Sequence, residues 1–490
     1  MRLRVSIGKY FLFFIGLFNA FVAFSQYEHS YSPAQIQDTI PQEVAEYLRT
    51  KLATQKKALS ASKVLHRNFV FSLYEKHNET LIKYFNDDYF IVKDELTDYL
   101  QSVLKRILQS NPQLQDQITI YAHRSSSPNA FTFWDGTIGV TLGLLTRMEN
   151  EDEVAFVICH ELAHYYGNHI DSRIQEIAKA NYDPEIEKEI RSVSNNRYEK
   201  YTRLKKIVKD LNLSLKHHSR GEEFAADSIG LTYFLRTTYQ PKASVRLMEI
   251  LDSAHVSKYR KNIDLKKSFS FQKYPFKESW LTYTKSAMKH NMSDEDYGDS
   301  DTVQTHPDCK RRIASLKRQL QRKEISFSSN LKSSESTNTI ARRSELEMIE
   351  SECHFKHYGK SFFYALALLE KYPNNIYVHS MIGRNLALIY QSLKDHQFGK
   401  TVQLPDERLD ENYNLVLAFL HNLRIMETAS LGYNYMTSKS ESYFTDEEFL
   451  YALWLICRTP VSDLSAQLVK EDYLKRFPEG RFVSLLNKAK

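Results

Sequence analysis

Residues that break helices are scarce in this sequence. Its 490 residues include only 14 glycines and 12 prolines, which predicts long helices joined by few tight turns. Hydrophobic residues make up 42% of the chain and charged residues 26%, as in ordinary globular proteins. This composition excludes collagen-like and intrinsically disordered chains, and the length suffices for two or three domains.

Cysteine is also scarce, which limits the number of disulfides and of cysteine-ligated metal sites that the chain could form. The four cysteines are Cys159, Cys309, Cys353 and Cys457, and no two of them have CxxC spacing. This excludes a disulfide scaffold and gives no indication of a cysteine-rich zinc site. An oxidising compartment would permit disulfides, but their pairing cannot be read from the sequence. We expect single buried thiols, with Cys159 serving in packing.

The chain has little excess charge of either sign. Its formal net charge is +6, and residues 1–25 contribute three basic residues and no acidic one, which leaves +3 for the remainder. Proteins that bind nucleic acid usually carry a larger excess of positive charge, so we expect no nucleic-acid partner. The mean hydropathy of −0.49 excludes a multi-span membrane protein.

One apolar run lies near the N-terminus. A basic start at 1–10 precedes an apolar run at 11–24, and the small residues Ala23 and Ser25 stand where a signal peptidase would cleave. This pattern predicts a signal peptide at 1–25 and an exported, periplasmic protein. The alternative is an uncleaved N-terminal membrane anchor, although the run is shorter than the roughly 20 residues that a spanning helix needs.

The first half of the chain mixes helix and strand patterns. We predict an N-terminal helical segment at 26–89 and a helix at 94–108, where apolar residues recur at helical spacing. Alternating and β-branched residues predict strands at 117–124 and 136–145. A helix with acidic residues at its start is expected at 151–169. These elements predict an α+β fold with a small sheet.

The second half is predicted to be almost entirely helical. A charged helical insertion is expected at 171–218, and a serine-rich linker at 326–343 precedes a helical domain at 344–490. Turns with Tyr-Pro or Phe-Pro at 372–375 and 477–480 each separate two helical patterns, as in tetratricopeptide-type repeats. The alternative is a plain helical bundle.

The five residues His160-Glu161-Leu162-Ala163-His164 carry the clearest chemical signal. On a helix, residues four apart lie one turn apart on the same face, so the two imidazoles can bind one Zn²⁺. Glu161 lies beside them, where it can take a proton from a water that the metal activates. The surrounding helix is apolar, which indicates a buried site, and buried ionisable residues need a partner or a metal.

A catalytic zinc site needs a third protein ligand and one open position. Glu223 is our candidate for this ligand, and Glu222 is the competing choice. Asp227 lies one turn after Glu223 on the same helical face, which favours Glu223. Asp227 is then placed to accept a hydrogen bond from the outer nitrogen of a ligand histidine.

These residues resemble those of the M48 family of zinc metallopeptidases. The similarity rests on the motif at 160–164 and on the pattern SRxxExxADxxG at 219–230. Three further segments resemble the family in the same order along the chain: Asn129-Ala130-Phe131, the strand pattern from Gly136 to Leu145, and Thr305-His306-Pro307 followed by Arg312-Ile313. The resemblance covers about residues 90–320. Thr132-Phe133-Trp134-Asp135 departs from it, because these residues are bulkier and more polar than expected.

The resemblance implies a zincin-like metallopeptidase domain at 90–325 that holds one Zn²⁺ per chain and acts as a metalloendopeptidase. A secreted domain of this kind followed by tetratricopeptide-like repeats resembles the periplasmic proteases and chaperones that monitor outer-membrane protein assembly. It implies polypeptide substrates, namely unfolded or misassembled envelope proteins, and protein partners for the C-terminal helical domain. The alternative is a chaperone or assembly scaffold with a latent or inactive metal site, although the intact Glu161 argues against it.

Two further site assignments remain open at this level. His306 could stabilise an oxyanion as a catalytic residue, could occupy the open zinc position and keep the enzyme latent, or could be an ordinary loop histidine; the resemblance favours a place near the metal. The strand at 136–145 could be an exposed edge to which an extended peptide adds, or a core strand. The edge interpretation predicts these substrate-binding residues: Gly136, Thr137, Ile138, Gly139 and Val140.

Overall fold

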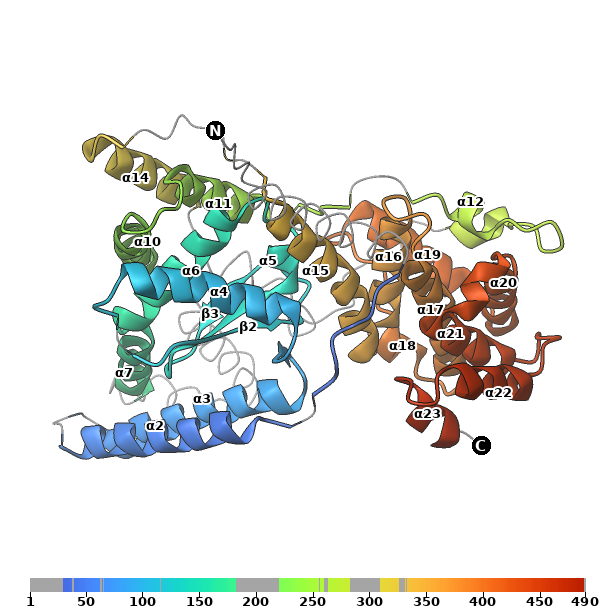
Figure 1. The fold of residues 1–490 in the computed structure, drawn as a ribbon, viewed down its shortest axis with the longest axis horizontal. Helices are drawn as coiled ribbons and strands as arrows, with labels where there is room; N and C mark the ends of the chain where they lie inside the picture. The colour runs from blue at the N-terminus through green and yellow to red at the C-terminus, as the bar shows by residue number, and fades with distance from the viewer. Residues whose placement is uncertain are drawn as a thin grey trace, which may run out of the picture. The chain divides into compact units, whose positions relative to one another are not determined.

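The computed structural model describes most of the chain and divides it into two compact units. The described residues are 30–37, 39–61, 64, 66–114, 116–181, 220–254, 256–259, 263–282, 309–325, 331 and 333–488. One unit, here called the sheet unit, takes its described residues from 34–255 and 297–341. The other, the helical unit, takes them from 1–33, 256–296 and 342–490 (Figure 1). The predicted signal peptide, most of the charged insertion and His306 lie outside the described residues.

The described residues of the sheet unit form one four-stranded sheet. Its strands are β1 (Phe90–Ile91), β2 (Thr119–His123), β3 (Ala130–Thr132) and β4 (Thr137–Thr141), in the order β1-β2-β4-β3. β2 and β4 are parallel, and the other two pairs are antiparallel. The predicted mixture of helices with a small sheet is confirmed. β2 lies within its predicted range, whereas β1 and β3 are too short to show a strand pattern in the sequence.

The edge-strand interpretation of 136–145 is wrong. β4 pairs with β2 on one side and with β3 on the other, and all five of its residues are buried. The strand also ends at Thr141, whose side chain caps the short helix α5 (Leu142–Leu145) by accepting a hydrogen bond from the Leu144 amide. The edge next to β4 is formed by β3.

Helices cover both faces of the sheet. On one face, an aromatic cluster joins the sheet to α2 (Gln42–Ala61) and α3 (Arg67–Asn86). Phe131 of β3 contributes to this cluster, and its ring lies over Gly139 of β4, where a Cβ would come within 2.4 Å of the ring. Side chains alternate along a strand, so Ala130 and Thr132 face the opposite side.

That opposite side carries the helices that build the candidate site. They are α4 (Glu95–Ser110), α6 (Glu151–Tyr166), α10 (Arg220–Phe234), α11 (Lys242–Asp252) and α14 (Cys309–Arg322), whereas α7 (His169–Asn181) packs against α2 and α3. α6 contains the whole motif at 160–164, and its N-terminus is capped by Asn150, which accepts a hydrogen bond from the Glu153 amide. The helix predicted at 151–169 begins where expected and ends at Tyr166, three residues earlier than predicted.

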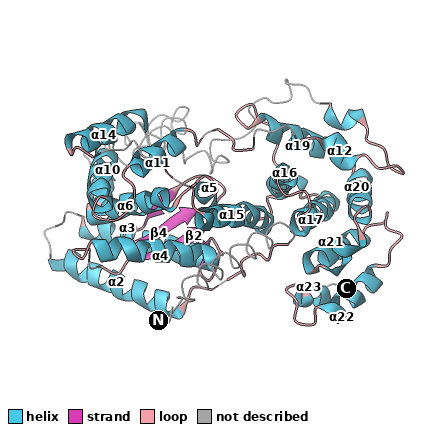
Figure 2. Cartoon of the chain, turned by 45° about the horizontal axis from the view of Figure 1, so that its top comes forward, coloured by secondary structure: helices cyan, strands magenta, loops and turns pink. Residues whose placement is uncertain are grey.

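The described part of the helical unit contains helices and no strand (Figure 2). The helices after the serine-rich segment are α15 (Glu335–His354), α16 (Tyr358–Leu369), α17 (Ile376–Lys394), α18 (Phe398–Thr401), α19 (Glu411–Asn422), α20 (Ile425–Thr437), α21 (Glu447–Cys457), α22 (Ala466–Arg476) and α23 (Val483–Lys488), with the short 3-10 helix η3 (Glu441–Thr445). The tetratricopeptide-like character of this array stays a prediction.

Two boundaries differ from those expected. The serine-rich segment is helical from Glu335 onward, because Ser334 accepts a hydrogen bond from the Thr337 amide at 3.1 Å and starts α15. The segment with α12 (Leu265–Phe269) and the 3-10 helix η1 (Glu278–Leu281) belongs to the helical unit rather than to a domain at 90–325. Its aromatic side chains enter that unit's core, where the Phe269 ring stacks on two rings of the helical array.

Two expectations concern the chain as a whole. Cys159, Cys353 and Cys457 are free thiols and are buried, and Cys159 lies fully inside the sheet unit. Within the described residues, no helix has both the length and the apolar character that crossing a bilayer requires.

Candidate metal centre

Two helices bring three ligand-type side chains together. His160 and His164 lie on α6, and Glu223 lies in the first turn of α10. The helices approach closely because α10 carries Gly230 where it passes α6. A Cβ on Gly230 would lie 3.0 Å from the Cys159 carbonyl oxygen and 3.1 Å from the backbone of His160. All three ligand-type residues are buried.

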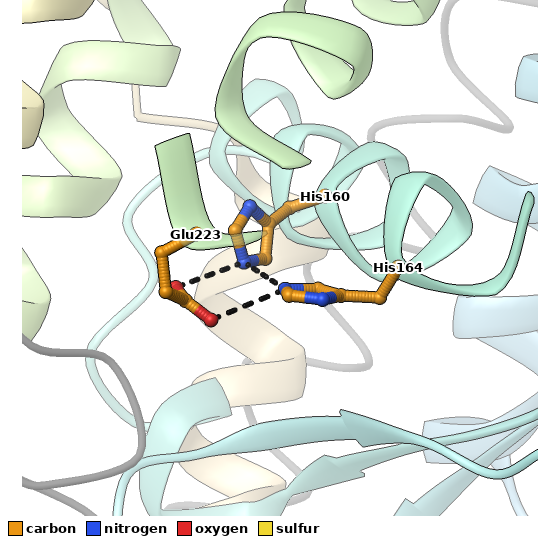
Figure 3. Close-up of side chains that lie close together, drawn as sticks. All are labelled: His160, His164 and Glu223. Carbon is orange, nitrogen blue, oxygen red and sulfur yellow. Dashed lines mark hydrogen bonds and ion pairs between the residues drawn. The ribbon is translucent and has the colours of Figure 1, made fainter. Parts of the chain in front are cut away.

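The distances within this group fit a tetrahedral metal site. The Nε2 atoms of His160 and His164 lie 3.0 Å apart, and the Glu223 oxygens lie 3.6 and 3.3 Å from them (Figure 3). Ligands about 2.0–2.1 Å from a tetrahedral zinc ion lie about 3.3 Å from one another. Two imidazole nitrogens and one carboxylate are also a donor set of catalytic zinc sites, so the residues present fit the predicted ion.

Asp227 and Arg312 form a second layer around the ligands. Asp227 lies 3.1 Å from Nδ1 of His160, on the side opposite the Nε2 atom. Arg312 of α14 donates two hydrogen bonds of 2.7 Å to the Asp227 carboxylate and lies 2.6 Å from a Glu223 oxygen. A single buried guanidinium thus holds both carboxylates.

The contacts of Asp227 and Arg312 shift the pKa values of Asp227 and of the ligand His160. Burial alone would raise the pKa of Asp227, but hydrogen bonds from Arg312 and His160 outweigh it and lower the pKa to about 2. Burial opposes the charged form of His160, yet its contacts with the carboxylates of Asp227 and Glu223 raise its pKa to about 9. Asp227 is therefore a carboxylate at neutral pH and an acceptor for the Nδ1 proton of His160.

Glu161 is buried beside the two histidines and is tied to the sheet. The Thr132 hydroxyl at the end of β3 donates to Oε2 of Glu161 at 2.7 Å and lies 3.2 Å from the Glu161 carbonyl oxygen. A carboxylate next to the metal position is suited to accept a proton from an attacking water.

The structure brings five predicted site residues together: His160, Glu161, His164, Glu223 and Asp227. It separates the two candidates for the third ligand, because Glu223 is fully buried whereas Glu222 is partly exposed. The predicted peptide-binding residues 136–140 are not at an open edge, and His306 lies outside the described residues.

Sequence reasoning gave no role to two residues of this centre. His169, the first residue of α7, places its Nδ1 2.9 Å from Nδ1 of His164. Arg312 had a detectable signal, because Arg312, Leu316 and Leu320 are spaced as one buried helical stripe. An arginine in such a stripe needs a buried acidic partner.

A group of two histidines and one glutamate with an adjacent buried glutamate is typical of zinc metallopeptidase sites, and comparison with known proteins finds similarity to the same class. Residues 94–320 match peptidase family M48. A β-barrel assembly-enhancing protease of Vibrio cholerae is 29% identical over 84 residues, which cover 17% of each chain. The mitochondrial metalloendopeptidase OMA1 of Schizosaccharomyces pombe is 28% identical over 158 residues, 32% of this chain and 44% of the yeast protein.

Residues 94–320 are therefore similar to peptidase family M48, and the resemblance inferred from the sequence is confirmed. The aligned segments span less than half the length of either relative.

Proposed function

We propose that this protein is a zinc-dependent endopeptidase that cleaves unfolded or misassembled envelope proteins. The observation that carries the proposal is the buried group of His160, His164 and Glu223 with Glu161 beside it. A bound zinc ion would supply Lewis acidity that lowers the pKa of a water to near 7. The protein's own residues supply the rest of the chemistry.

Each residue has a distinct task in this proposal. His160 and His164 present Nε2 to the ion, and Glu223 presents a carboxylate oxygen. Asp227 fixes the tautomer of His160 by accepting its Nδ1 proton. Glu161 takes a proton from the attacking water on its carboxylate and passes it to the nitrogen of the leaving amine. His306 is proposed to lie near the same site.

The substrate is proposed to bind along β3 rather than β4. β3 is the edge strand next to β4 among the described strands, and its last residue hydrogen-bonds Glu161. An extended peptide that pairs with a strand edge is held by its backbone, so binding requires little side-chain specificity. This mode suits unfolded polypeptides, whose backbone groups are free to pair.

The cellular setting rests on two observations. The N-terminal sequence predicts export, and one relative is named for enhancing β-barrel assembly. We therefore propose a periplasmic enzyme of envelope-protein quality control, with a membrane anchor at residues 1–25 as the alternative. The tetratricopeptide-like helices at 344–490 are proposed to bind protein partners.

The deciding experiment measures zinc and cleavage in the same preparations. Protein purified without chelator is assayed for metal by mass spectrometry and for cleavage of fluorescein-labelled casein. We expect about one zinc per chain in the wild type, in Glu161→Gln and in Glu222→Ala, and loss of zinc in Glu223→Ala. Cleavage should persist in Glu222→Ala and fall about 10²–10⁴-fold in Glu161→Gln.

Two outcomes would contradict the proposal. A zinc-loaded wild type that cleaves no unfolded polypeptide would refute the activity. Full biological function of Glu161→Gln in cells would favour a chaperone or assembly scaffold with a latent site, even if zinc is bound.

A further inference from the structure

Thr132 occupies an unusual place at the end of the edge strand. Its hydroxyl lies 2.7 Å from Oε2 of Glu161 and 3.2 Å from the Glu161 carbonyl oxygen, so its single hydrogen is directed mainly at the carboxylate. Within the described residues, it is the one side chain that hydrogen-bonds the Glu161 carboxylate. No described side chain hydrogen-bonds the other carboxylate oxygen, Oε1, so this atom is available to a reacting group.

The backbone explains why Thr132 can reach the helix. In β3, Phe131 points into the aromatic cluster on the far side of the sheet, and its neighbours Ala130 and Thr132 point towards α6. The register of β3 on β4, with Thr132 opposite Ile138, fixes the height of the hydroxyl along α6. The contact therefore follows from the sheet and not from a mobile surface side chain.

We propose that Thr132 is a positioning residue, which holds the Glu161 carboxylate in the orientation that proton transfer requires. The inference rests on the proposed peptidase function. A carboxylate on a flexible side chain loses catalytic efficiency when its orientation is not fixed, because the proton must pass over hydrogen-bond distance in one geometry. The same hydroxyl joins the base to the strand along which the substrate is proposed to lie.

Three variants separate the hydroxyl from the shape of the side chain. Thr132→Val removes the hydroxyl and keeps the volume, and Thr132→Ser keeps the hydroxyl. Thr119→Val is the matched control, because the Thr119 hydroxyl contacts Thr137 in the same sheet, away from Glu161. In zinc-loaded enzyme, we expect Thr132→Val to lower kcat about ten-fold with KM within about two-fold. Thr132→Ser and Thr119→Val should stay within about two-fold of the wild type in both constants.

A second measurement needs neither zinc nor activity. The melting temperatures of zinc-free wild type, Thr132→Val, Glu161→Ala and the double variant form a double-mutant cycle. Because the hydroxyl and the carboxylate interact, the change in melting temperature of the double variant should differ from the sum of the changes of the two single variants by roughly 2–4 °C. Additive shifts would overturn the proposed contact.

The kinetic outcomes distinguish this inference from the function on which it rests. An active wild type with an unchanged Thr132→Val overturns the role of Thr132 and leaves the peptidase intact. Equal losses in Thr132→Val and Thr132→Ser also overturn it, because side-chain shape would then matter instead of the hydroxyl. An inactive, zinc-loaded wild type overturns both. If Thr132→Val does not fold, Thr132→Ala takes its place in both measurements.

Discussion

At the scale of single residues, charge balance shapes the metal centre. The side chains of Glu223 and Asp227 are almost completely buried, and each would be costly to ionise without a partner. Arg312 neutralises both carboxylates. Its Nε and Nη2 atoms donate hydrogen bonds to Asp227, and its Nη1 atom contacts Glu223. Its geometry matters as much as its charge, because an ammonium cannot form the two parallel hydrogen bonds.

The first prediction concerns this arginine. Arg312→Lys should weaken zinc binding about 10–100-fold, because the carboxylate ligand and the support of His160 both lose their orientation. Arg312→Met should also lower the free energy of unfolding by about 3–5 kcal/mol, because it leaves two buried carboxylates without their cation. Zinc affinity is measured by competition with a chelator, and stability by urea unfolding of the zinc-free protein.

The exposed Arg318 on the same helix provides the matched control. Arg318→Met should change neither the free energy of zinc binding nor the free energy of unfolding by more than about 0.5 kcal/mol. Zinc binding of Arg312→Lys at the level of the wild type would show that charge alone, without the forked contact, supports the centre.

At the scale of elements, the site depends on how closely α10 approaches α6. Gly230 allows this approach, since the atoms nearest to an added Cβ belong to the backbone of Cys159 and His160. Backbone atoms within a buried helix cannot move aside as the end of a flexible side chain can. Any side chain at this position therefore separates the two helices that supply the metal ligands.

The second prediction follows from that contact. Gly230→Ala should lower the free energy of unfolding by about 1–3 kcal/mol and reduce zinc affinity, because it displaces Glu223 from the two histidines. Thermal melting with and without zinc measures both effects. Gly399, where an added Cβ would meet nothing within 4 Å, is the control. A Gly230→Ala protein as stable and as zinc-loaded as the wild type would contradict the close helix contact.

A buried acidic residue in α15 gives the third prediction. Glu345 lies 2.7 and 2.6 Å from the Nζ atoms of Lys258 and Lys371 and accepts a hydrogen bond from Tyr372. Burial would raise the pKa of Glu345, but the two lysines outweigh it and lower the pKa. A lowered folded-state pKa adds stability above the unfolded value of about 4.3, and this stability is lost as the pH falls through the folded-state pKa.

Glu345→Gln should therefore lower the free energy of unfolding by about 2 kcal/mol at pH 7 and by much less at pH 3. The effect at pH 7 is moderate because both lysines are partly exposed and solvent screens their charges. Urea unfolding followed by circular dichroism at both pH values measures the difference. The exposed Glu441→Gln serves as the control. A loss for Glu345→Gln as large at pH 3 as at pH 7 would rule out this ion-pair contribution.

The sequence predicted the elements that carry a periodic pattern and missed those set by distant pairing. The helix with the motif at 160–164 was evident because its apolar and acidic residues follow helical rules. The three-residue strand β3 has no period long enough to recognise. Whether β4 lies at an edge depends on β2 and β3 pairing with it, which its own residues do not encode.

The candidate site shows the same division. His160, His164 and Glu223 were predicted from local spacing, and the structure places them together. The contact between Arg312 and Asp227 joins residues 85 positions apart, and the contact between Thr132 and Glu161 depends on strand register. Such contacts depend on tertiary packing, so the pattern of nearby residues does not reveal them.

At the scale of the whole molecule, the two units have separate cores, and the metal centre belongs to one of them. The ligands lie on α6 and α10 of the sheet unit, whereas the largest aromatic and aliphatic cluster of the helical unit centres on α16, α17, α19 and α21. Zinc binding stabilises the state in which its ligands are assembled, by about 2.7 kcal/mol when zinc exceeds its Kd a hundred-fold. This stabilisation should be felt where the ligands are held.

The fourth prediction is that zinc removal loosens the sheet unit alone. Hydrogen exchange measured by mass spectrometry should show faster exchange in peptides from α6 and α10 after chelation, because opening that separates the ligands is no longer opposed by binding. Peptides from α17 and α21 should exchange at unchanged rates, since their buried contacts contain no ligand. Glu223→Ala, which cannot bind zinc in this scheme, should show no response to the chelator. Equal acceleration in α17 and α6 would instead mean that both units open together, and that zinc stabilises the molecule as one cooperative structure.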